Sequence, residues 1–306
     1  MSIDAEHHPL PPTLGLNKEV RDAISTRIIP IDYPAASWPA THPYIVSASL
    51  ASADSDILTY LRGEPGWVLV DTGFANRDDC ELISAAWNLF SSLCRPVPQY
   101  RTGELVYFVE VANKLAQASS HYSQSNKSGG FHTDGTLLDM TPDIAMLAGI
   151  STADEGGETV LIDGHAVVAR LAELSSQSVS SLEDFHPFHS GDESDPVVAH
   201  RVIDRSTQSP VIRYMRRYIE LGYIKRQGAV SDCLTAALQD LDALTGDPRH
   251  QTAVLIKRGY LLLWNNQRCL HGRRPFKELR ERRRLLRTYG MESPFQPSSG
   301  LRDEAK

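Results

Sequence analysis

The stretch Gly130-Phe131-His132-Thr133-Asp134-Gly135 places an imidazole and a carboxylate two residues apart. Side chains at positions i and i+2 of a β-strand point to the same face, so one extended segment can present His132 and Asp134 together. A neutral ring nitrogen and an anionic oxygen on one face suit a single metal ion. The pair is weak evidence alone, because 11 histidines and 38 acidic residues among 306 give about one such pair by chance.

Three further features follow this pair in a fixed order. Thr159, at the end of the run Gly156-Gly157-Glu158-Thr159, comes 25 residues after Asp134. His271 comes 137 residues after Asp134, in the block Trp264-Asn265-Asn266-Gln267-Arg268-Cys269-Leu270-His271-Gly272-Arg273-Arg274-Pro275-Phe276. The run Arg282-Arg283-Arg284-Leu285-Leu286-Arg287 comes last. Two histidines and one carboxylate can form the facial triad of non-heme Fe(II) oxygenases, which leaves open positions on the metal.

These blocks resemble the taurine dioxygenase and clavaminate synthase-like family of oxygenases, which depend on Fe(II) and 2-oxoglutarate, over residues 60–292. The resemblance implies a distorted double-stranded β-helix (jelly roll). It also implies that His132, Asp134 and His271 are the ligands of Fe(II) and the catalytic centre. Thr159 would help a downstream arginine to bind the distal carboxylate of 2-oxoglutarate.

The family pattern R-x-x-x-R fits Arg283 and Arg287. The first would bind 2-oxoglutarate and the second an anionic group of the cofactor or the substrate. A guanidinium is a planar donor that keeps its charge and pairs with a carboxylate through two hydrogen bonds. In a strand, Arg283, Leu285 and Arg287 share one face. The neighbours Arg282 and Arg284 leave a shift by one residue open.

The reaction implied by the resemblance is the oxidation of a small substrate by O₂, with succinate and CO₂ as co-products. We expect an amino-acid-like or natural-product substrate, as in antibiotic biosynthesis. Hydroxylation is the default outcome, while desaturation, epoxidation, cyclisation and epimerisation stay open. Halogenation is disfavoured, because Asp134 fills the position where a halide needs a small residue and an open site.

Two other functions are compatible with parts of the pattern. A zinc or manganese hydrolase or isomerase on a jelly roll could use the same three ligands, but it gives Thr159 and Arg283 no role. A non-catalytic binding module with a vestigial site does not explain an intact ligand set. Both are less favoured than an oxygenase.

Four residues are candidates for contact with the substrate. Phe131 flanks the first ligand and forms either core packing or a pocket wall. Asn126 lies in the polar loop before this strand, and Arg213 belongs to the basic, aromatic run Arg213-Tyr214-Met215-Arg216-Arg217, which is either solvated surface or a site for an acidic group. Arg287 is the fourth candidate.

Composition restricts the class of protein and its partners. The 306 residues are 41% hydrophobic and 23% charged, which is typical of a globular chain with a sizeable core. A net charge of −7 with one basic cluster suggests a small anionic ligand and no nucleic-acid partner. There is no C-x-x-C pair, signal core or membrane-spanning stretch, so we expect a cytoplasmic protein with no membrane partner. The oligomeric state stays open.

The order of short apolar runs favours an antiparallel, mainly β core with helical decoration. Seven of 18 prolines lie in residues 1–43, which predicts an irregular arm before a single jelly-roll domain over 44–306. Residues 183–199, acidic and containing proline and glycine, are expected to form a mobile lid. Helices are predicted at 18–27, 77–93, 166–174 and 232–245, and strands at 67–70, 105–111, 144–150, 160–162, 211–218, 260–264 and 283–289.

Overall fold

Two facing β-sheets form the centre of the computed structural model, which describes residues 11–25, 48–100, 102–111, 126–207, 209–280 and 282–292. The major sheet contains, in spatial order, β1 (Thr13–Gly15), β2 (Trp67–Asp71), β14 (Tyr260–Asn265), β6 (Ile144–Ser151), β17 (Arg284–Met291) and β3 (Arg95–Val97), with β4 (Val106–Val109) also paired to β17. The minor sheet contains β13 (Thr252–Val254), β8 (Thr159–Asp163), β15 (Cys269–Arg273) and β5 (Gly129–His132).

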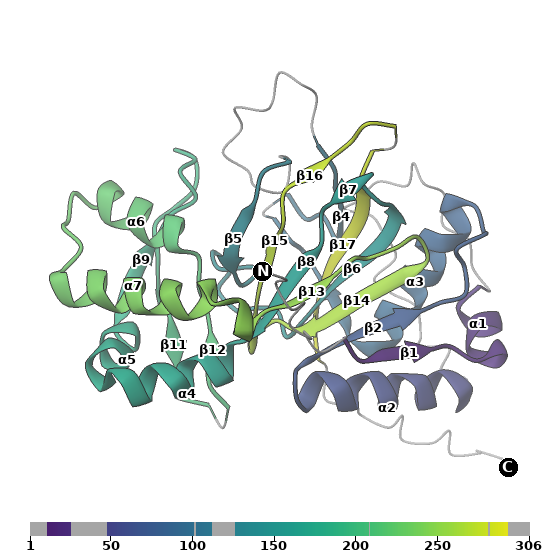
Figure 1. Cartoon of the computed structure of the whole chain (residues 1–306), viewed down its shortest axis with the longest axis horizontal. Coiled ribbons are helices and arrows are strands. Elements are labelled where there is room, and N and C mark those ends of the chain that lie inside the picture. The colour runs from purple at the N-terminus through teal and green to yellow at the C-terminus, as the bar shows by residue number, and fades with distance from the viewer. Residues whose placement is uncertain are drawn as a thin grey trace, which may run out of the picture.

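Antiparallel pairing dominates both sheets. Among the described strands, β1 and β2 form the one parallel pair. The double-stranded β-helix predicted from sequence is confirmed, with helices added on both outer faces (Figure 1). A short ladder of β7 (Glu155–Gly156) with β16 (Phe276–Lys277) extends one end of the sheets.

Alternation along the strands divides the major sheet into an outer and an inner face. On β14, Leu261 and Leu263 pack outward, whereas Leu262 and Trp264 point into the space between the sheets. The inner cluster draws residues from both sheets, among them Leu161 of β8, and therefore joins them. This period of two is what the pleat of a strand imposes.

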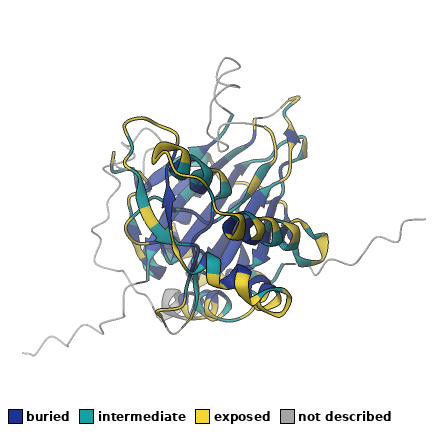
Figure 2. Cartoon of the chain, turned by 90° about the vertical axis from the view of Figure 1, so that its left-hand side faces the viewer, coloured by how far each residue is buried: buried dark blue, intermediate teal, exposed yellow. Residues whose placement is uncertain are grey.

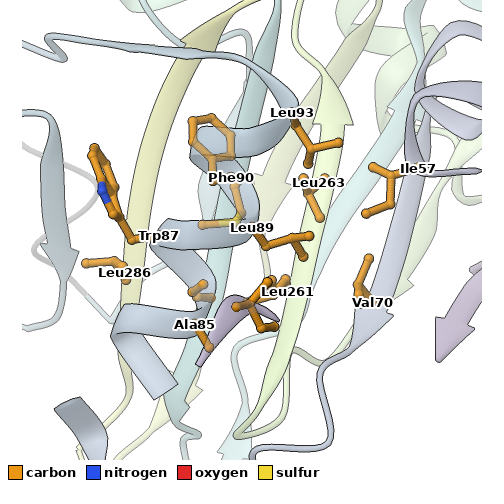
Figure 3. Close-up of a cluster of buried hydrophobic side chains, with 14 of the residues drawn as sticks. Ile57, Val70, Ala85, Trp87, Leu89, Phe90, Leu93, Leu261, Leu263 and Leu286 are labelled. Atoms are coloured by element: carbon orange, nitrogen blue, oxygen red, sulfur yellow. The ribbon is translucent and has the colours of Figure 1, made fainter. Parts of the chain in front are cut away.

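Helices α1 (Lys18–Ile24), α2 (Ala48–Arg62) and α3 (Asp79–Leu93) cover the outer face of the major sheet (Figures 1 and 3). Asp78 begins α3 with a capping box, because its side chain accepts from the Glu81 amide and the Glu81 carboxylate accepts from the Asp78 amide. Leu89 and Phe90 of α3 are completely buried, and each contributes about 2 kcal/mol by leaving water. Helix α2 was not predicted.

Helices α4 (Gly164–Leu174), α5 (Ser176–Leu182), α6 (Arg216–Lys225) and α7 (Asp232–Gly246) form a second layer, with a separate buried cluster beside the minor sheet (Figures 1 and 2). One strand prediction in this layer is wrong, and the segment predicted as a lid is flanked by strands. Residues 211–218 are not one strand, because β12 (Val211–Ile212), paired with β11 (Ile203–Asp204), is followed by α6. Strands β9 (Phe185–Phe188) and β10 (Val198–Arg201) pair as a hairpin, and the loop between them, 189–197, makes up most of the segment 183–199, whose role as a lid stays a prediction.

The predicted arm, residues 1–43, lies largely outside the described residues. Its described part, residues 11–25, contains β1 and α1, and β1 pairs with β2 of the major sheet. A short 3₁₀ helix, η3 (Pro248–His250), connects α7 to β13. Within the described residues, every helix is too short or too polar to cross a lipid bilayer.

Candidate active site

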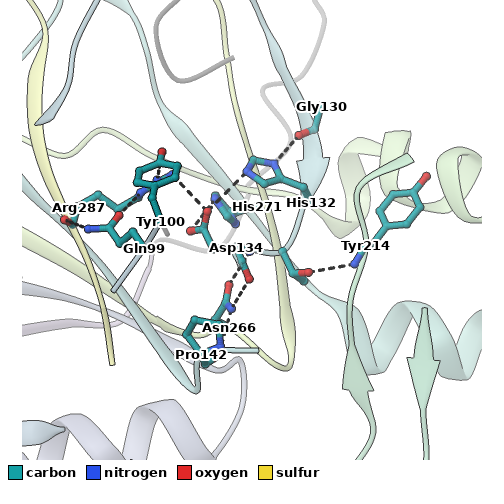
Figure 4. A network of polar contacts seen from close by, with 11 residues as sticks. Gln99, Tyr100, Gly130, His132, Asp134, Pro142, Tyr214, Asn266, His271 and Arg287 are labelled. Carbon is teal, nitrogen blue, oxygen red and sulfur yellow. Dashed lines mark hydrogen bonds and ion pairs between the residues drawn. The ribbon is translucent and has the colours of Figure 1, made fainter. Parts of the chain in front are cut away.

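His132, Asp134 and His271 converge between the two sheets, at the end of β5 and in β15 (Figure 4). The ligand atoms of the three side chains all lie within 4.8 Å of one another. Nε2 of His271 is 3.4 Å from Oδ2 of Asp134, and Nε2 of His132 is 4.0 Å from Oδ1. Backbone pairing of His132 with His271 in the β5–β15 ladder explains this convergence. Two imidazoles and one carboxylate so arranged could hold one divalent ion.

Hydrogen bonds to the backbone fix the segment that carries these side chains. The completely buried amide of Asn266 accepts from the Asp134 N–H at 2.9 Å and donates to the carbonyls of Asp134 and Pro142. On the other side, the Thr133 N–H donates to the Tyr214 carbonyl, and the Thr133 hydroxyl accepts from the Tyr214 N–H. Asp134 therefore has a fixed backbone although it lies beyond the end of β5.

Both histidines are held in the neutral form that a metal requires. Burial lowers the pKa of His271 to about 3, and it also lowers the pKa of His132. Nδ1 of His132 lies 2.9 Å from the Gly130 carbonyl, which requires a proton on Nδ1 and leaves Nε2 free to bind a metal. The Trp264 ring lies beside the His271 ring, with centroids 4.8 Å apart and planes inclined by 46°, and so restricts the imidazole.

Asp134 stays ionised because a permanent cation and two polar rings surround it. Burial opposes its charge, but the neighbouring His271, the Arg287 guanidinium and His132 together lower its pKa. Arg287 is the permanent cation among them, with Nη1 3.4 Å from Oδ1 of Asp134. Oδ2 of Asp134 is sealed from solvent and accepts no hydrogen bond, as expected for an atom that awaits a metal.

Arg287 is itself held on β17 by Gln99 and Tyr100. Nε donates to the Gln99 side-chain oxygen at 2.8 Å, and Nη2 donates to the Tyr100 hydroxyl at 2.9 Å. The guanidinium also lies over the Tyr289 ring, 4.9 Å from its centroid. Gln99 and Tyr100, which the sequence did not single out, therefore fix the cation next to the ligand set.

A cavity of about 460 Å³ opens beside the ligand set, a size typical of small-molecule sites. It is lined by Gln99, Tyr100, His132, Thr133, Asp134, Gly135, Thr136, Leu137, Leu138, Asp139, Ser190, Asp195, Pro196, Val198, Met215, Tyr218, Arg287 and Tyr289. The loop between β9 and β10, within the segment predicted as a lid, supplies Ser190, Asp195 and Pro196 to the lining of the cavity.

The side chains of Thr159 and Arg283 are both buried. Arg283 and Arg273 form a second positively charged region besides Arg287, which we call the cationic corner. Thr159 begins β8 and pairs with Arg273 of β15, and the guanidinium groups of Arg273 and Arg283 lie 5.0 and 5.3 Å from the centroid of the Phe276 ring. Burial, reinforced by Arg273, lowers the pKa of Arg283 to about 9, against the opposing field of Glu278. Such a corner favours a carboxylate ligand. Arg273 belongs to the His-Gly-Arg block but was not singled out from sequence.

Arg283 and Arg287 do not share a strand face, contrary to the prediction from sequence. Strand β17 begins at Arg284, and its register against β6 shifts between Arg284 and Leu285. Leu285, Arg287 and Tyr289 therefore share the inner face, whereas Arg283 precedes the strand. Its side chain is nevertheless buried, with 5% of its surface exposed.

Three of the predicted substrate residues lie outside the cavity. Phe131 packs against the helical cluster behind the minor sheet. Asn126 is exposed, and its carbonyl accepts from the Phe276 N–H. Arg213 is buried and donates to the carbonyls of Thr136 and Leu138, which shapes the cavity wall from behind. Of the four candidates, only Arg287 lines the cavity.

The family model for taurine catabolism dioxygenase TauD, TfdA family, matches residues 48–289, which include the whole ligand set. The chain belongs to the TauD, TfdA family. It is therefore a dioxygenase that depends on Fe(II) and 2-oxoglutarate, and the donor set fits this metal.

Curated relatives of this TauD-family chain include two proteins named uridine-5'-phosphate dioxygenase. The one from Amycolatopsis sp is 27% identical over 266 residues, which is 79% of this chain and 92% of the relative. The one from Streptomyces sp is 28% identical over 190 residues, which is 57% of this chain and 65% of the relative.

Solved structures with the same fold include two iron-containing oxygenases. An asparagine oxygenase in complex with Fe(II), 3-hydroxyasparagine and succinate has a TM-score of 0.67 at 15% identity, covering 92% of this chain and 93% of that chain. The non-heme iron oxygenase OrfP in complex with Fe and alpha-ketoglutaric acid has a TM-score of 0.63 at 15% identity, covering 92% and 95%. At identities this low, the structural likeness shows a shared fold and nothing more.

Proposed function

We propose that this TauD-family oxygenase oxidises a small amino-acid-like or natural-product substrate, with hydroxylation as the default outcome. The observation that carries the proposal is the convergence of His132, Asp134 and His271 within 4.8 Å, beside a cavity of about 460 Å³. These three residues would hold Fe(II). When bound, Fe(II) and 2-oxoglutarate together activate O₂ and release succinate and CO₂.

The role of Arg283 and Thr159 is to bind the distal carboxylate of 2-oxoglutarate. Both side chains are buried, so a charged hydrogen bond there is screened little by water. Arg273 increases the positive field at Arg283. A dicarboxylate therefore gains at this corner an interaction that a monocarboxylic keto acid lacks.

The role of Arg287 is to keep Asp134 ionised and to present positive charge at the metal end of the cavity. Its Nη1 faces Asp134, and its other donors are fixed by Gln99 and Tyr100. An anionic group of the cofactor or substrate would approach this guanidinium. Buried apolar residues of both sheets surround the site and limit the access of water.

The named relatives suggest two substrate classes. Two relatives act, by name, on uridine 5'-phosphate, and two structural neighbours contain bound 3-hydroxyasparagine or hydroxy-L-arginine. Both classes are small, polar molecules, as are the intermediates of antibiotic biosynthesis. A cavity of about 460 Å³ accommodates either class beside the cofactor.

Two alternative functions give no account of these groups. A zinc or manganese hydrolase or isomerase would use the three ligands but would give no role to the buried Arg283 and the half-buried Arg273. A non-catalytic module would not need Asp134 to be kept ionised and without a hydrogen bond at Oδ2.

The proposal is tested by anaerobic titration of the metal-free protein with Fe(II) and then 2-oxoglutarate. We expect a visible metal-to-ligand charge-transfer band, and absence of the band in the wild-type protein would contradict the proposal. Arg283→Ala should raise the 2-oxoglutarate concentration for half-saturation by about a hundredfold. Arg282→Ala is the matched control, because Arg282 is the exposed neighbour and should leave that concentration unchanged.

A further inference from the structure

We propose that residues 151–157, together with Glu278, form a clamp that positions Arg283 for the distal carboxylate of 2-oxoglutarate, and that Asp154 is its main positioning residue. The inference rests on the proposed function, in which Arg283 binds this carboxylate. It extends that function by naming the residues that direct the Arg283 guanidinium into the cationic corner.

Strand pairing does not fix the backbone of Arg283. Strand β17 begins at Arg284, and its register against β6 shifts between Arg284 and Leu285. An irregularity of this kind interrupts the ladder and changes the direction of the neighbouring side chains. Arg283 precedes it, yet Arg283 is buried, with 5% of its surface exposed. Because a guanidinium must meet a carboxylate with defined geometry, other contacts have to hold the chain at this point.

Asp154, in the turn between β6 and β7, holds the chain that leads to Arg283. Its Oδ2 accepts from the backbone N–H of Leu279 at 2.7 Å and from that of Arg280 at 3.0 Å. Its own N–H donates to the Lys277 carbonyl at 3.1 Å. The Asp154 side chain is only 12% exposed, and hydrogen bonds from N–H groups to a carboxylate are strong because the acceptor is charged.

Two further contacts hold the chain next to Arg283. The hydroxyl of Ser151, the last residue of β6, donates to the Arg282 carbonyl. The Glu278 carboxylate accepts from the Arg283 N–H at 2.8 Å. Both contacts are made to backbone groups, so neither occupies a donor of the Arg283 guanidinium. The clamp therefore fixes the start of the side chain and leaves its end for a ligand.

Gly157 provides an independent observation, because the Arg283 side chain passes directly over it. A Cβ atom at Gly157 would lie 3.2 Å from both Cδ and Nε of Arg283 and 3.3 Å from Cβ of Phe276. Gly157 also has a φ of +82°, which a glycine adopts without strain. The second glycine of the run Gly156-Gly157-Glu158-Thr159 thus leaves a path for Arg283. Asp154, three residues earlier, fixes the backbone from which that side chain starts.

The affinity for two keto acids tests the clamp. Anaerobic titration of the Fe(II)-loaded full chain, followed by the charge-transfer band, would compare 2-oxoglutarate with 2-oxobutyrate, which lacks the distal carboxylate. We expect Asp154→Ala to raise the Kd for 2-oxoglutarate about tenfold, as the loss of one well-directed charged hydrogen bond would. The Kd for 2-oxobutyrate and the affinity for Co(II) should stay within about twofold, because neither depends on Arg283. Equal weakening of both keto acids overturns the inference.

Two variants separate the contacts of Asp154 from a general effect on the fold. Asp154→Asn keeps an oxygen that can accept from both N–H groups, so its Kd for 2-oxoglutarate should stay within about threefold of the wild type. Glu155→Ala is the matched control, because Glu155 is the adjacent residue and pairs with the exposed Lys277 in an ion pair of little energetic weight. A tenfold weakening in Glu155→Ala would contradict the assignment to Asp154.

A double-mutant cycle shows whether Asp154 acts through Arg283. Once Arg283→Ala has removed the guanidinium, Asp154→Ala should weaken 2-oxoglutarate binding further by less than about twofold. A full additional effect in the double variant overturns the clamp. Unchanged affinity in Asp154→Ala, with weakened binding in Arg283→Ala, also refutes the clamp and leaves the proposed function intact. Unchanged affinity in Arg283→Ala refutes the proposed role of Arg283 and the clamp with it, so the two failures are distinguishable.

Discussion

Asp134 and Asp54 are two carboxylates with similar burial and opposite electrostatics. Asp134 lies between the two sheets with 4% of its surface exposed, and Asp54 lies on α2 beside α3 with 8% exposed. The pKa of Asp134 is lowered, whereas burial raises the pKa of Asp54 to about 7, against one opposing hydrogen bond from Ser92. Burial alone therefore does not decide whether a carboxylate is charged.

The neighbours explain the difference. Asp134 faces two imidazoles and a guanidinium that is fixed by Gln99 and Tyr100. The Ser92 hydroxyl, 3.0 Å from Oδ1 of Asp54, is a neutral donor and offsets only part of the cost of desolvation. In the inner region one fixed guanidinium, that of Arg287, helps to keep the carboxylate of Asp134 ionised, whereas in the helical region the carboxylate of Asp54 protonates readily.

The same substitution at both sites should have the most unequal effect on activity. Asp134→Asn removes the anionic ligand, so we expect metal affinity to fall strongly and 2-oxoglutarate turnover to drop by at least about a thousandfold. Asp54→Asn should leave both within twofold. Co(II) titration followed by visible absorption measures the metal affinity of both variants, and succinate release measures their 2-oxoglutarate turnover. If Asp134→Asn binds the metal as tightly as the wild-type protein, Asp134 is not a metal ligand.

Arg287→Gln should raise the pKa of Asp134 and so bring it closer to the raised pKa of Asp54. Loss of the permanent cation raises the pKa of Asp134, so protons compete with the metal at a higher pH than in the wild-type protein. We expect Co(II) affinity to fall about tenfold more at pH 6 than at pH 8, and the metal-free variant to lose about 3 kcal/mol of stability. Arg284→Gln, on the same strand but paired with Glu110, is the control. Equal affinities at both pH values would show that Arg287 does not set the charge of Asp134.

Asn266→Ala tests whether a fixed backbone, and not charge alone, distinguishes the two carboxylates. The substitution leaves the N–H and carbonyl of Asp134 without their partner, as well as the Pro142 carbonyl. We expect about tenfold weaker metal binding and about 2 kcal/mol lower stability to unfolding by urea. Asn265→Ala is the neighbouring control, since its amide supports the loop around residues 267 and 268. Unchanged metal affinity in Asn266→Ala would show that Asn266 stabilises the fold but does not position Asp134 for metal binding.

The sequence predicted that His132, Asp134 and His271 come together, because the signals are local or belong to long motif blocks. His132 and Asp134 are two residues apart, and His271 lies in the Trp-Asn-Asn to Pro-Phe block. Strands β6 and β14 and helices α3 and α7 also matched their patterns, since buried strands are continuously apolar and both helices begin at capping residues.

The supporting contacts could not be predicted, because they join backbone groups across long distances in sequence. Asn266 contacts Asp134 across 132 residues, and Arg213 contacts Leu138 across 75. The error at 211–218 has a local cause. Val211 and Ile212 favour a strand, but the ion pair of Arg216 with Glu220 at helical spacing marks α6 and went unused.

Asp54→Asn should have the smallest effect, visible only as a function of pH. With a folded pKa of about 7 and an unfolded value near 3.8, wild-type stability from Asp54 is fully present below pH 4 and is lost as pH rises toward 7. An asparagine has no proton to lose and can still accept from Ser92, so the variant should gain about 1–2 kcal/mol over the wild type at pH 8 and nothing at pH 4. Urea unfolding of both proteins across this pH range isolates the contribution of Asp54 to the free energy of unfolding, because all other groups titrate alike in the two proteins. A constant difference would mean that Asp54 is ionised in the folded protein as readily as in the unfolded chain, and the contrast with Asp134 would then lie in the metal alone.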